Sequence, residues 1–224
     1  MNKTGIIKSA LIIFAREPKE GKVKTRLAKD LSHRTVTELY KAFVRDVLNV
    51  AAQVKCDQRF IYYVGRAGAM PFLEKFAKRF SLKRQIGATL GDRLHQAFCA
   101  CQKKSFNRIV VIGTDCVTLK EEDIEQAFKK LEFHDCVLGP SKDGGYYLMA
   151  LRMADFNLFK DIPWSTSQVF EQTCQKIREA GKSIFLLRGQ EDIDTIANLK
   201  QLSHTIDGSS IAIHTQNTLA RISL

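Results

Sequence analysis

Short, continuously apolar runs that alternate with amphipathic stretches constrain the fold of this chain more than any other feature. The apolar runs are typical of buried strands and read ALIIFA, RFIYYVG, RIVVIGTD, DCVLGP, GYYLMAL and SIFLLR. The stretches between them have helical spacing, as in TVTELYKAFVRDVLNVAAQV, MPFLEKFAKRF, TLGDRLHQAFCACQKK and EEDIEQAFKKL. This order predicts an α/β protein with a mostly parallel or mixed sheet covered by helices on both faces. In such sheets, ligands bind outside the carboxyl ends of the strands.

Length and composition favour one domain over residues 1–224. The 224-residue sequence contains no internal repeat, low-complexity tract or Pro/Ser-rich linker. No apolar run has the length of a membrane span, and we interpret the N-terminal run as the first strand rather than a signal peptide. The six cysteines form no C-x-x-C pair, which indicates reduced thiols and a cytoplasmic protein.

The formal net charge of +11 indicates a protein that attracts anions. A nucleotide or another phosphorylated small molecule is one class of partner, nucleic acid is a second, and a basic surface that only aids solubility is the plainer alternative. The aromatic residues do not alternate with the basic ones as a platform for single strands requires. The sequence therefore favours a small phosphorylated ligand over nucleic acid.

The loop FAREPKEGKVKTRLAKDLS, from Phe14 to Ser32, follows the first predicted strand and is rich in cations. If GKVKTRL is extended, Lys22, Lys24 and Arg26 share one face, because side chains two residues apart point the same way. Three converging cations at the end of a strand would suit a polyphosphate. The loop does not match the Walker A pattern, and a solvated basic loop is the alternative.

Carboxylates follow three other predicted strands. Asp115 ends VVIGTDC, where it could hold a divalent cation that bridges phosphates, or could simply be a turn residue. Asp143 precedes two glycines in GPSKDGGYYLMAL, as a second metal-facing carboxylate or part of a hairpin turn. Asp192 and Asp194 follow the last strand. Asp143 and Asp194 are both candidates for a catalytic base.

Two further motifs could line a ligand pocket. QIGATLGDRL places Gln85, Gly91 and Arg93 around a helix start, where they could bind a base or sugar or only stabilise the helix. IPWSTSQV contains the only tryptophan, Trp164, which could stack on a ring but is more simply explained as a core residue. The sequence contains no G-x-S-x-G, H-E-x-x-H or G-x-G-x-x-G motif.

Taken in order, FAREPKEGKVKTRL, QIGATLGDRL, VIGTDCVTL, LGPSKDGGYYLMAL, IPWSTSQV and DIDTIANL resemble a bacterial family of glycosyltransferase-like proteins. These are described as nucleotide-diphospho-sugar transferase-like, or as radical-SAM/selenodomain-associated transferases. More distantly, the chain is similar to molybdopterin and phospholactate guanylyltransferases. The resemblance implies a glycosyltransferase-A fold, which is a three-layer α/β/α arrangement with a Rossmann-like sheet, and a site that uses Mg²⁺ or Mn²⁺.

The resemblance places Lys24, Thr25 and Arg26 in the phosphate loop, Asp115 at the metal-binding aspartate and Asp143 beside the acceptor region. The sequence patterns described above supply the other candidate residues. Asp115 would bind the metal with Asp143, and Asp143, Lys24 and Arg26 would serve catalysis. The nucleotide and its phosphates would contact Arg16, Gly21, Lys22, Lys24, Thr25, Arg26, Gln85, Gly91 and Arg93. The acceptor would lie near Gly144, Gly145, Tyr146 and Trp164.

The expected activity is metal-dependent transfer of a sugar from a nucleotide to an unknown acceptor. Nucleotidyl transfer with release of pyrophosphate is the alternative, since the sequence does not separate the two reactions. The usual Gly-Thr-Asp-Ser-Pro reads Gly-Thr-Asp-Cys-Val at residues 113–117, so the proline that stiffens this turn is missing. A catalytically degenerate or nucleic-acid-binding member of the fold is the further alternative.

Overall fold

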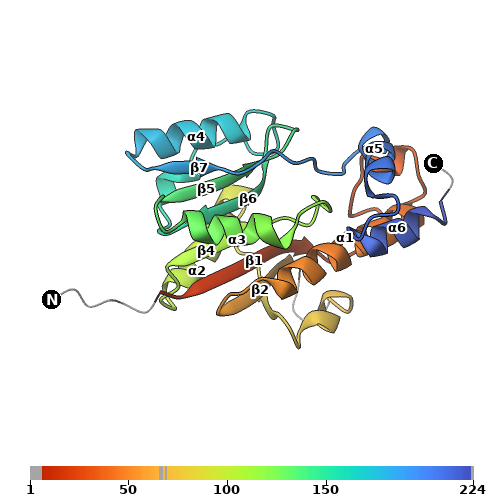
Figure 1. The fold of residues 1–224 in the computed structure, drawn as a ribbon, viewed down its shortest axis with the longest axis horizontal. Helices are drawn as coiled ribbons and strands as arrows, with labels where there is room; N and C mark the ends of the chain where they lie inside the picture. The colour runs from red at the N-terminus through yellow and green to blue at the C-terminus, as the bar shows by residue number, and fades with distance from the viewer. Residues whose placement is uncertain (1–6, 66–67, 69, 223–224) are drawn as a thin grey trace.

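The computed structural model describes residues 7–65, 68 and 70–222, and a seven-stranded sheet forms its centre. The strand order is β3-β2-β1-β4-β6-β5-β7 (Figure 1). Neighbouring strands pair in parallel, except that β6 is antiparallel to both β4 and β5. The strands are β1 (Ser9–Arg16), β2 (Gln58–Val64), β3 (Ser81–Arg84), β4 (Arg108–Ile112), β5 (Cys136–Pro140), β6 (Tyr146–Leu151) and β7 (Ile184–Leu186). The predicted fold class is confirmed.

Helices cover both faces of the sheet, which explains why its strands are apolar on both sides. In β1, Leu11 and Ile13 pack toward α1 and α3, whereas Ala10 and Ile12 pack toward α2 and α4. The helix α6 packs beside α1 at one end of the molecule, and α5 lies next to α6 (Figure 1). The helices are α1 (His33–Gln53), α2 (Leu90–Gln102), α3 (Glu121–Lys130), α4 (Val169–Glu179), α5 (Ile196–Ile206) and α6 (Ile213–Leu219).

Four elements of the chain differ from the sequence-based expectation or were not part of it. MPFLEKFAKRF does not form the expected helix but a single 3₁₀ turn at Leu73–Phe76. The carboxylate of Glu17 accepts hydrogen bonds from the backbone amides of Phe72 and Leu73 and so fixes the start of this turn. The strand β3 and the helices α5 and α6 were not predicted.

Two expectations drawn from composition are tested by the described residues. All six cysteines are free thiols there, as predicted. No helix in the described ranges is long and apolar enough to cross a membrane.

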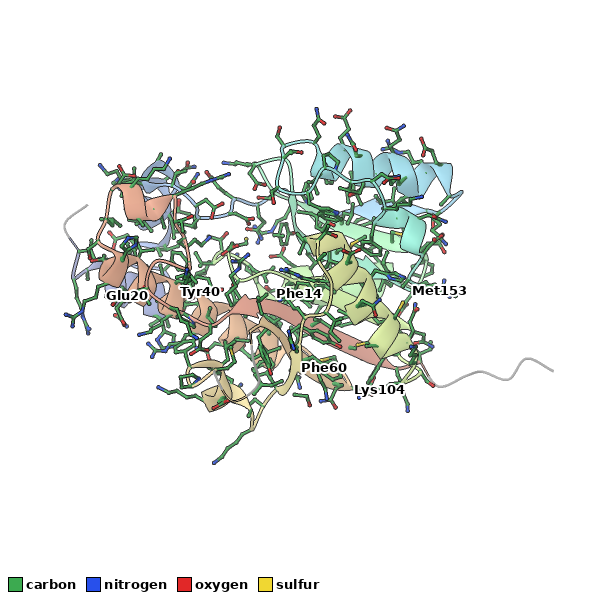
Figure 2. The ribbon with its side chains drawn as sticks, turned by 180° about the vertical axis from the view of Figure 1, so that it is seen from behind. Phe14, Glu20, Tyr40, Phe60, Lys104 and Met153 are labelled. Carbon is green, nitrogen blue, oxygen red and sulfur yellow. The ribbon has the colours of Figure 1, made fainter. Side chains whose placement is uncertain are left out.

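The antiparallel strand β6 brings one more segment to the carboxyl edge of the sheet. Ile112 at the end of β4 pairs with Leu148 near the start of β6. Because β6 runs the opposite way, the turn that precedes Tyr146 lies at the edge where β1 and β4 end. Figure 2 views the molecule from the side of α2, with Phe14 near this end of β1 and Tyr40 of α1 close by.

Candidate functional site

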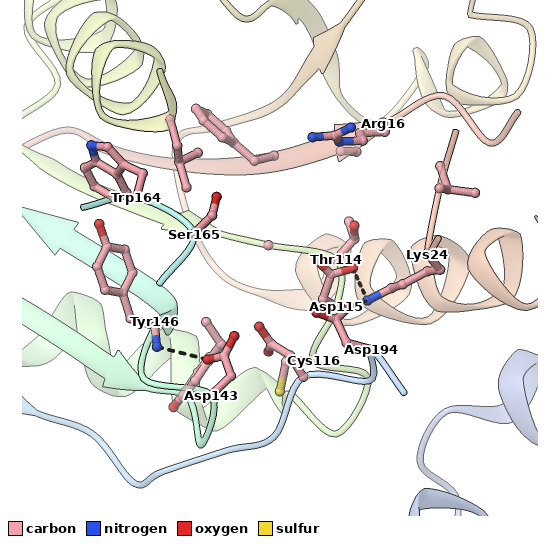
Figure 3. A pocket seen from close by; sticks show the side chains of 18 of the residues that line it. Arg16, Lys24, Thr114, Asp115, Cys116, Asp143, Tyr146, Trp164, Ser165 and Asp194 are labelled. Atoms are coloured by element: carbon pink, nitrogen blue, oxygen red, sulfur yellow. Dashed lines mark hydrogen bonds and ion pairs between the residues drawn. The ribbon is translucent and has the colours of Figure 1, made fainter. Parts of the chain in front are cut away.

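A cavity of about 830 Å³ opens at the carboxyl edge of the sheet. Its walls come from the end of β1 and the loop after it, the segments after β4 and β7, and the loops that flank β6 (Figure 3). The cavity therefore lies at the edge where the sequence predicted a ligand site. One end carries the charged residues Lys24, Asp115 and Asp194, and the other carries Tyr146 and Trp164.

Lys24 has an enclosed ammonium at the charged end of the cavity. Its Nζ lies 2.7 Å from Asp115 Oδ1 and 2.8 Å from Asp194 Oδ1, and its side chain is only 4% exposed. The ammonium also lies 5.9 Å from the ring centroid of Phe43. Burial by itself lowers the pKa of Lys24, but the two carboxylates outweigh it and hold the pKa above its usual value. Lys24 is thus a paired, charged group.

The loop around Lys24 is not extended, so that expectation was wrong. Lys24 has φ +46°, in the left-handed region, and a 3₁₀ turn follows at Leu27–Lys29. Val23 and Leu27 are buried in the core and anchor the loop on either side of Lys24. The convergence of Lys22, Lys24 and Arg26 on one cavity is nevertheless observed.

Tyr40 connects the loops that follow β1 and β4. Its hydroxyl lies 3.1 Å from Thr114 Oγ1 and accepts a 3.0 Å hydrogen bond from the backbone amide of Arg16. Burial raises the pKa of Tyr40, and the nearby charge of Asp115 raises it further, so the phenol stays protonated. The sequence placed Tyr40 in the apolar face of a helix, and no local signal reveals its contact with Thr114.

The turn before β6 holds Asp143 in one orientation. Asp143 Oδ1 accepts a 2.9 Å hydrogen bond from the backbone amide of Gly145 (Figure 3). Gly144 has φ +87°, and a Cβ at this position would lie 2.1 Å from the carbonyl oxygen of Ser167. Glycine is therefore required at residue 144 by both the backbone conformation and the close approach of the next loop.

The segment 187–194, which we call the strap, carries two more carboxylates into the cavity. Arg188 donates two 2.7 Å hydrogen bonds to the carboxylate of Asp123. The same carboxylate accepts a 3.0 Å hydrogen bond from the side-chain amide of Gln190. The backbone amide of Ile193 donates to the carbonyl of Asp115 at 3.0 Å. These contacts hold the strap against α3 and the end of β4, with Asp192 and Asp194 facing the cavity.

Asp192 is the carboxylate whose environment is most perturbed. Its Oδ1 is buried without a hydrogen-bond partner. Burial raises the pKa of Asp192 to about 7, with further contributions from the charges of Asp115 and Asp143, while Lys24 opposes the rise. Asp192 thus brings to the cavity wall a carboxylate with one unpaired oxygen, which could accept a cation or a proton.

The other end of the cavity is aromatic and apolar. Tyr146 and Trp164 meet edge to face with ring centroids 6.5 Å apart. A Cβ at Gly91 would lie 2.6 Å from Trp164 Nε1, so α2 approaches the indole closely. Phe14 and Leu90 also line the cavity here. Flat or apolar parts of a ligand would bind at this end.

Most of the residues that the sequence proposed for a site lie in one cavity. Those that line it are Arg16, Lys22, Lys24, Thr25, Arg26, Gln85, Arg93, Asp115, Asp143, Gly145, Tyr146 and Trp164. Gly21, Gly91 and Gly144 do not line it; they shape the turns and the helix contact behind it. Gln85 donates its amide to the Tyr62 carbonyl and Arg93 its guanidinium to the carbonyls of Gly87 and Ala88. Both side chains thus brace the wall that they form.

The cavity offers oxygen donors suited to Mg²⁺ or Mn²⁺. Asp115, Asp143, Asp192 and Asp194 all line it, and the free Oδ1 of Asp192 fits a hard cation. Within the described ranges, however, no group of three or more His, Cys, Asp or Glu side chains is arranged to hold a metal. Two of the four carboxylates are instead paired with Lys24.

Residues 47–166, more than half of the chain, match the family described as "Uncharacterized protein conserved in bacteria (DUF2064)". The chain belongs to this family. No protein in the curated set matches it in sequence.

This DUF2064 chain is similar to solved structures at two levels, one with clear sequence identity and others in fold only. A crystal structure from Desulfovibrio desulfuricans G20, provisionally named a nucleotide-diphospho-sugar transferase, is 29% identical with a TM-score of 0.88, covering 96% of this chain and 95% of that one. The 4-diphosphocytidyl-2C-methyl-D-erythritol synthase of Anaerococcus prevotii DSM 20548 is 12% identical, with a TM-score of 0.58 and coverage of 96% and 97%. A CMP-2-keto-3-deoxy-manno-octonic acid synthetase complexed with CTP is 13% identical, with a TM-score of 0.52 and coverage of 89% and 98%. The resemblance to nucleotide-diphospho-sugar transferases is thus confirmed for family and fold, and the cytidylyltransferases share the fold alone.

Proposed function

We propose that the chain is a transferase that binds a nucleotide diphosphate sugar in the 830 Å³ cavity and transfers the sugar to an acceptor. The observation that carries this proposal is the division of one cavity into a charged end and an aromatic end. Cavities of about 300–1,000 Å³ hold ligands of this size. The likeness to the D. desulfuricans protein supports the same class of substrate.

The loop after β1 would bind the diphosphate. Arg16, Lys22 and Arg26 are exposed and line the cavity, so their charges are available to an incoming anion. Arginine can hold a phosphate through two parallel hydrogen bonds, and lysine adds a compact charge. These cations would stabilise the negative charge that develops on the departing nucleotide when the bond to the sugar breaks.

Asp115 with Asp143 would hold Mg²⁺ or Mn²⁺, and Asp192 would add a further oxygen. The bound metal would neutralise phosphate charge and act as a Lewis acid. The hydrogen bond from Gly145 would keep Asp143 directed at the reacting end of the ligand.

The acceptor would enter at the aromatic end. Tyr146 and Trp164 form a wall there, and the turn that carries Asp143 lies directly beside Tyr146. Asp143 or Asp194 would receive the proton of the attacking acceptor group, since both carboxylates line the cavity. The close packing of Gly91 against Trp164 would keep this wall rigid.

Nucleotidyl transfer is the second candidate, and the number of cations in the basic loop favours it. Four of the five cations in this loop, Arg16, Lys22, Lys24 and Arg26, line the cavity and would suit a triphosphate, with pyrophosphate as the product. The CTP complex of a protein with the same fold supports this reaction class in general.

Thermal unfolding against nucleoside triphosphates, nucleoside diphosphates and nucleotide sugars, each with and without Mn²⁺, tests the proposal. A ligand that binds the native state raises the melting temperature, and a concentration of 100 times Kd adds about 2.7 kcal/mol. We expect a Mn²⁺-dependent shift with at least one nucleotide sugar. Preference for a triphosphate would favour nucleotidyl transfer, and no shift with any ligand would indicate a degenerate member of the fold.

A double variant that reverses two charges in the basic loop tests where the ligand binds. Lys22→Glu with Arg26→Glu should abolish the shift, because both residues are exposed and their loss should not unfold the protein. Lys24 is unsuitable for this test, since a third carboxylate beside Asp115 and Asp194 would be buried there. Lys78→Glu with Arg79→Glu is the control: it changes the net charge equally at exposed residues outside the cavity. An unaltered shift in the first pair would contradict the proposal.

A further inference from the structure

The position of Lys24 implies that this site discriminates between a free metal ion and a metal–nucleotide complex. We propose that Lys24 is a built-in counter-ion of Asp115 and Asp194, and that a divalent metal enters only together with a polyphosphate that draws the ammonium away. This inference rests on the proposed function, since it takes the ligand to be a nucleotide. It specifies the form of that ligand as the metal complex.

Lys24, Asp115 and Asp194 have the geometry of an occupied cation site, with the ammonium as the cation. The ammonium lies within 2.8 Å of both carboxylates, and it is 4% exposed where Asp115 and Asp194 are 45% and 36% exposed. All three side chains line the cavity, and the ammonium is the most enclosed of the three groups. The left-handed backbone at Lys24, φ +46°, is rare for a residue with a Cβ. The chain adopts this conformation where it places the ammonium between the two acids.

A free divalent ion meets an unfavourable field here. The charge of Lys24 already compensates half the charge of Asp115 and Asp194, and an added metal would lie close to the like charge of the ammonium. The remaining acids, Asp143 and Asp192, do not complete a metal-binding group within the described part of the chain. Lys24 therefore accounts for the absence of a preformed cluster in a cavity lined by four carboxylates.

A polyphosphate changes this balance. Its oxygens accept the same charge-assisted hydrogen bonds that the carboxylates accept, so Lys24 can exchange partners without losing its pairing. Asp115 is then released for the metal that accompanies the phosphates. Arg26 holds Asp194 only weakly, with Nη1 3.7 Å from Oδ2, and Lys22 lies on the same loop. The loop thus has the groups needed to receive the phosphates while Lys24 moves.

Mn²⁺ binding measured by electron paramagnetic resonance, first without nucleotide, tests the counter-ion role. We expect Lys24→Met to bind free Mn²⁺ at least tenfold more tightly than the wild type, because two partly exposed carboxylates lose their cation. Lys22→Met is the matched control: it removes a cation that lines the same cavity but pairs with neither acid, and should change the affinity less than threefold. Equal Mn²⁺ affinity in the wild type and Lys24→Met would overturn the proposal.

A second measurement uses only the wild type, in case Lys24→Met fails to fold. Mn²⁺ affinity should rise at least tenfold when the nucleotide identified by thermal unfolding is present, and by linkage Mn²⁺ should raise nucleotide affinity by the same factor. Tight binding of Mn²⁺ alone would contradict the proposal. If no nucleotide binds, the proposed function fails, but the comparison of Lys24→Met with the wild type in Mn²⁺ alone still decides the role of Lys24.

Discussion

At the scale of single residues, the contact between Gly91 and Trp164 sets the shape of the aromatic end. A Cβ at residue 91 would lie 2.6 Å from Trp164 Nε1, so Gly91→Ala should push the indole toward the cavity. Because Trp164 is the only tryptophan, its fluorescence should shift to longer wavelength as the ring meets more water. The stability cost should stay within about 1 kcal/mol, since alanine is the better helix former.

Gly189→Ala is the control for this substitution. A Cβ there would lie 3.9 Å from the carbonyl oxygen of Pro140, which is an ordinary contact, so the emission spectrum should not change. An unshifted spectrum in Gly91→Ala as well would mean that the indole is not fixed by the helix.

The sequence placed Lys24 among the candidate site residues but did not reveal its environment. Its place after the first strand marks it as a cation near the sheet edge, and the local pattern carries that information. Its partner Asp194 is 170 residues away, and the fold alone brings the two together. Tyr40 shows the same limit, because helical spacing places it in the core while its hydroxyl contacts Thr114 across the sheet edge.

At the scale of elements, the strap depends on α3 through Asp123. Asp123 is buried, accepts hydrogen bonds from Arg188 and Gln190 of the strap, and also caps its own helix through the Lys120 amide. Asp123→Ala should lower the free energy of unfolding by about 2–3 kcal/mol, below the full cost of breaking a buried pair because Arg188 is half exposed. Urea denaturation measures the change.

Glu122→Ala provides the comparison for Asp123→Ala. It removes the same charge from the same first turn of α3, but Glu122 is exposed, so the loss should be about 0.5 kcal/mol. Asp123→Ala should also weaken nucleotide binding, since it frees the segment that carries Asp192 and Asp194. Equal effects of the two substitutions would show that the strap is held in another way.

Elements with a strong local pattern, either a continuous apolar run or helical spacing, could be predicted from the sequence. Elements defined by tertiary contacts could not. The runs that became β1, β4, β5 and β6 are buried on both sides, so their composition alone identifies them. β3 is a four-residue edge strand that exposes Lys83 and Arg84, and it lacks that signal. α6 starts where the carboxylate of Asp46, in α1, accepts hydrogen bonds from the amides of His214 and Thr215.

At the scale of the whole molecule, the order of elements determined the fold class and the place of the site. Alternating strands and helices imply a mainly parallel sheet, and the carboxyl edge of such a sheet collects the loops that carry charge. The expected single domain over residues 1–224 is a separate question, because it concerns whether these layers unfold together. The core on one face of the sheet includes residues of α1, α3, α5 and α6, which span most of the chain.

This shared core leads us to expect one cooperative unfolding transition. The seven strands form one continuous sheet, so the halves of the chain cannot separate without breaking it between β1 and β4. Trp164 fluorescence reports on the site near β6, and far-UV circular dichroism reports on all helices and strands. In urea the two signals should give the same midpoint, as two-state unfolding requires. A fluorescence transition that clearly precedes the loss of helical signal would instead indicate that the part of the chain around the site unfolds as a separate domain.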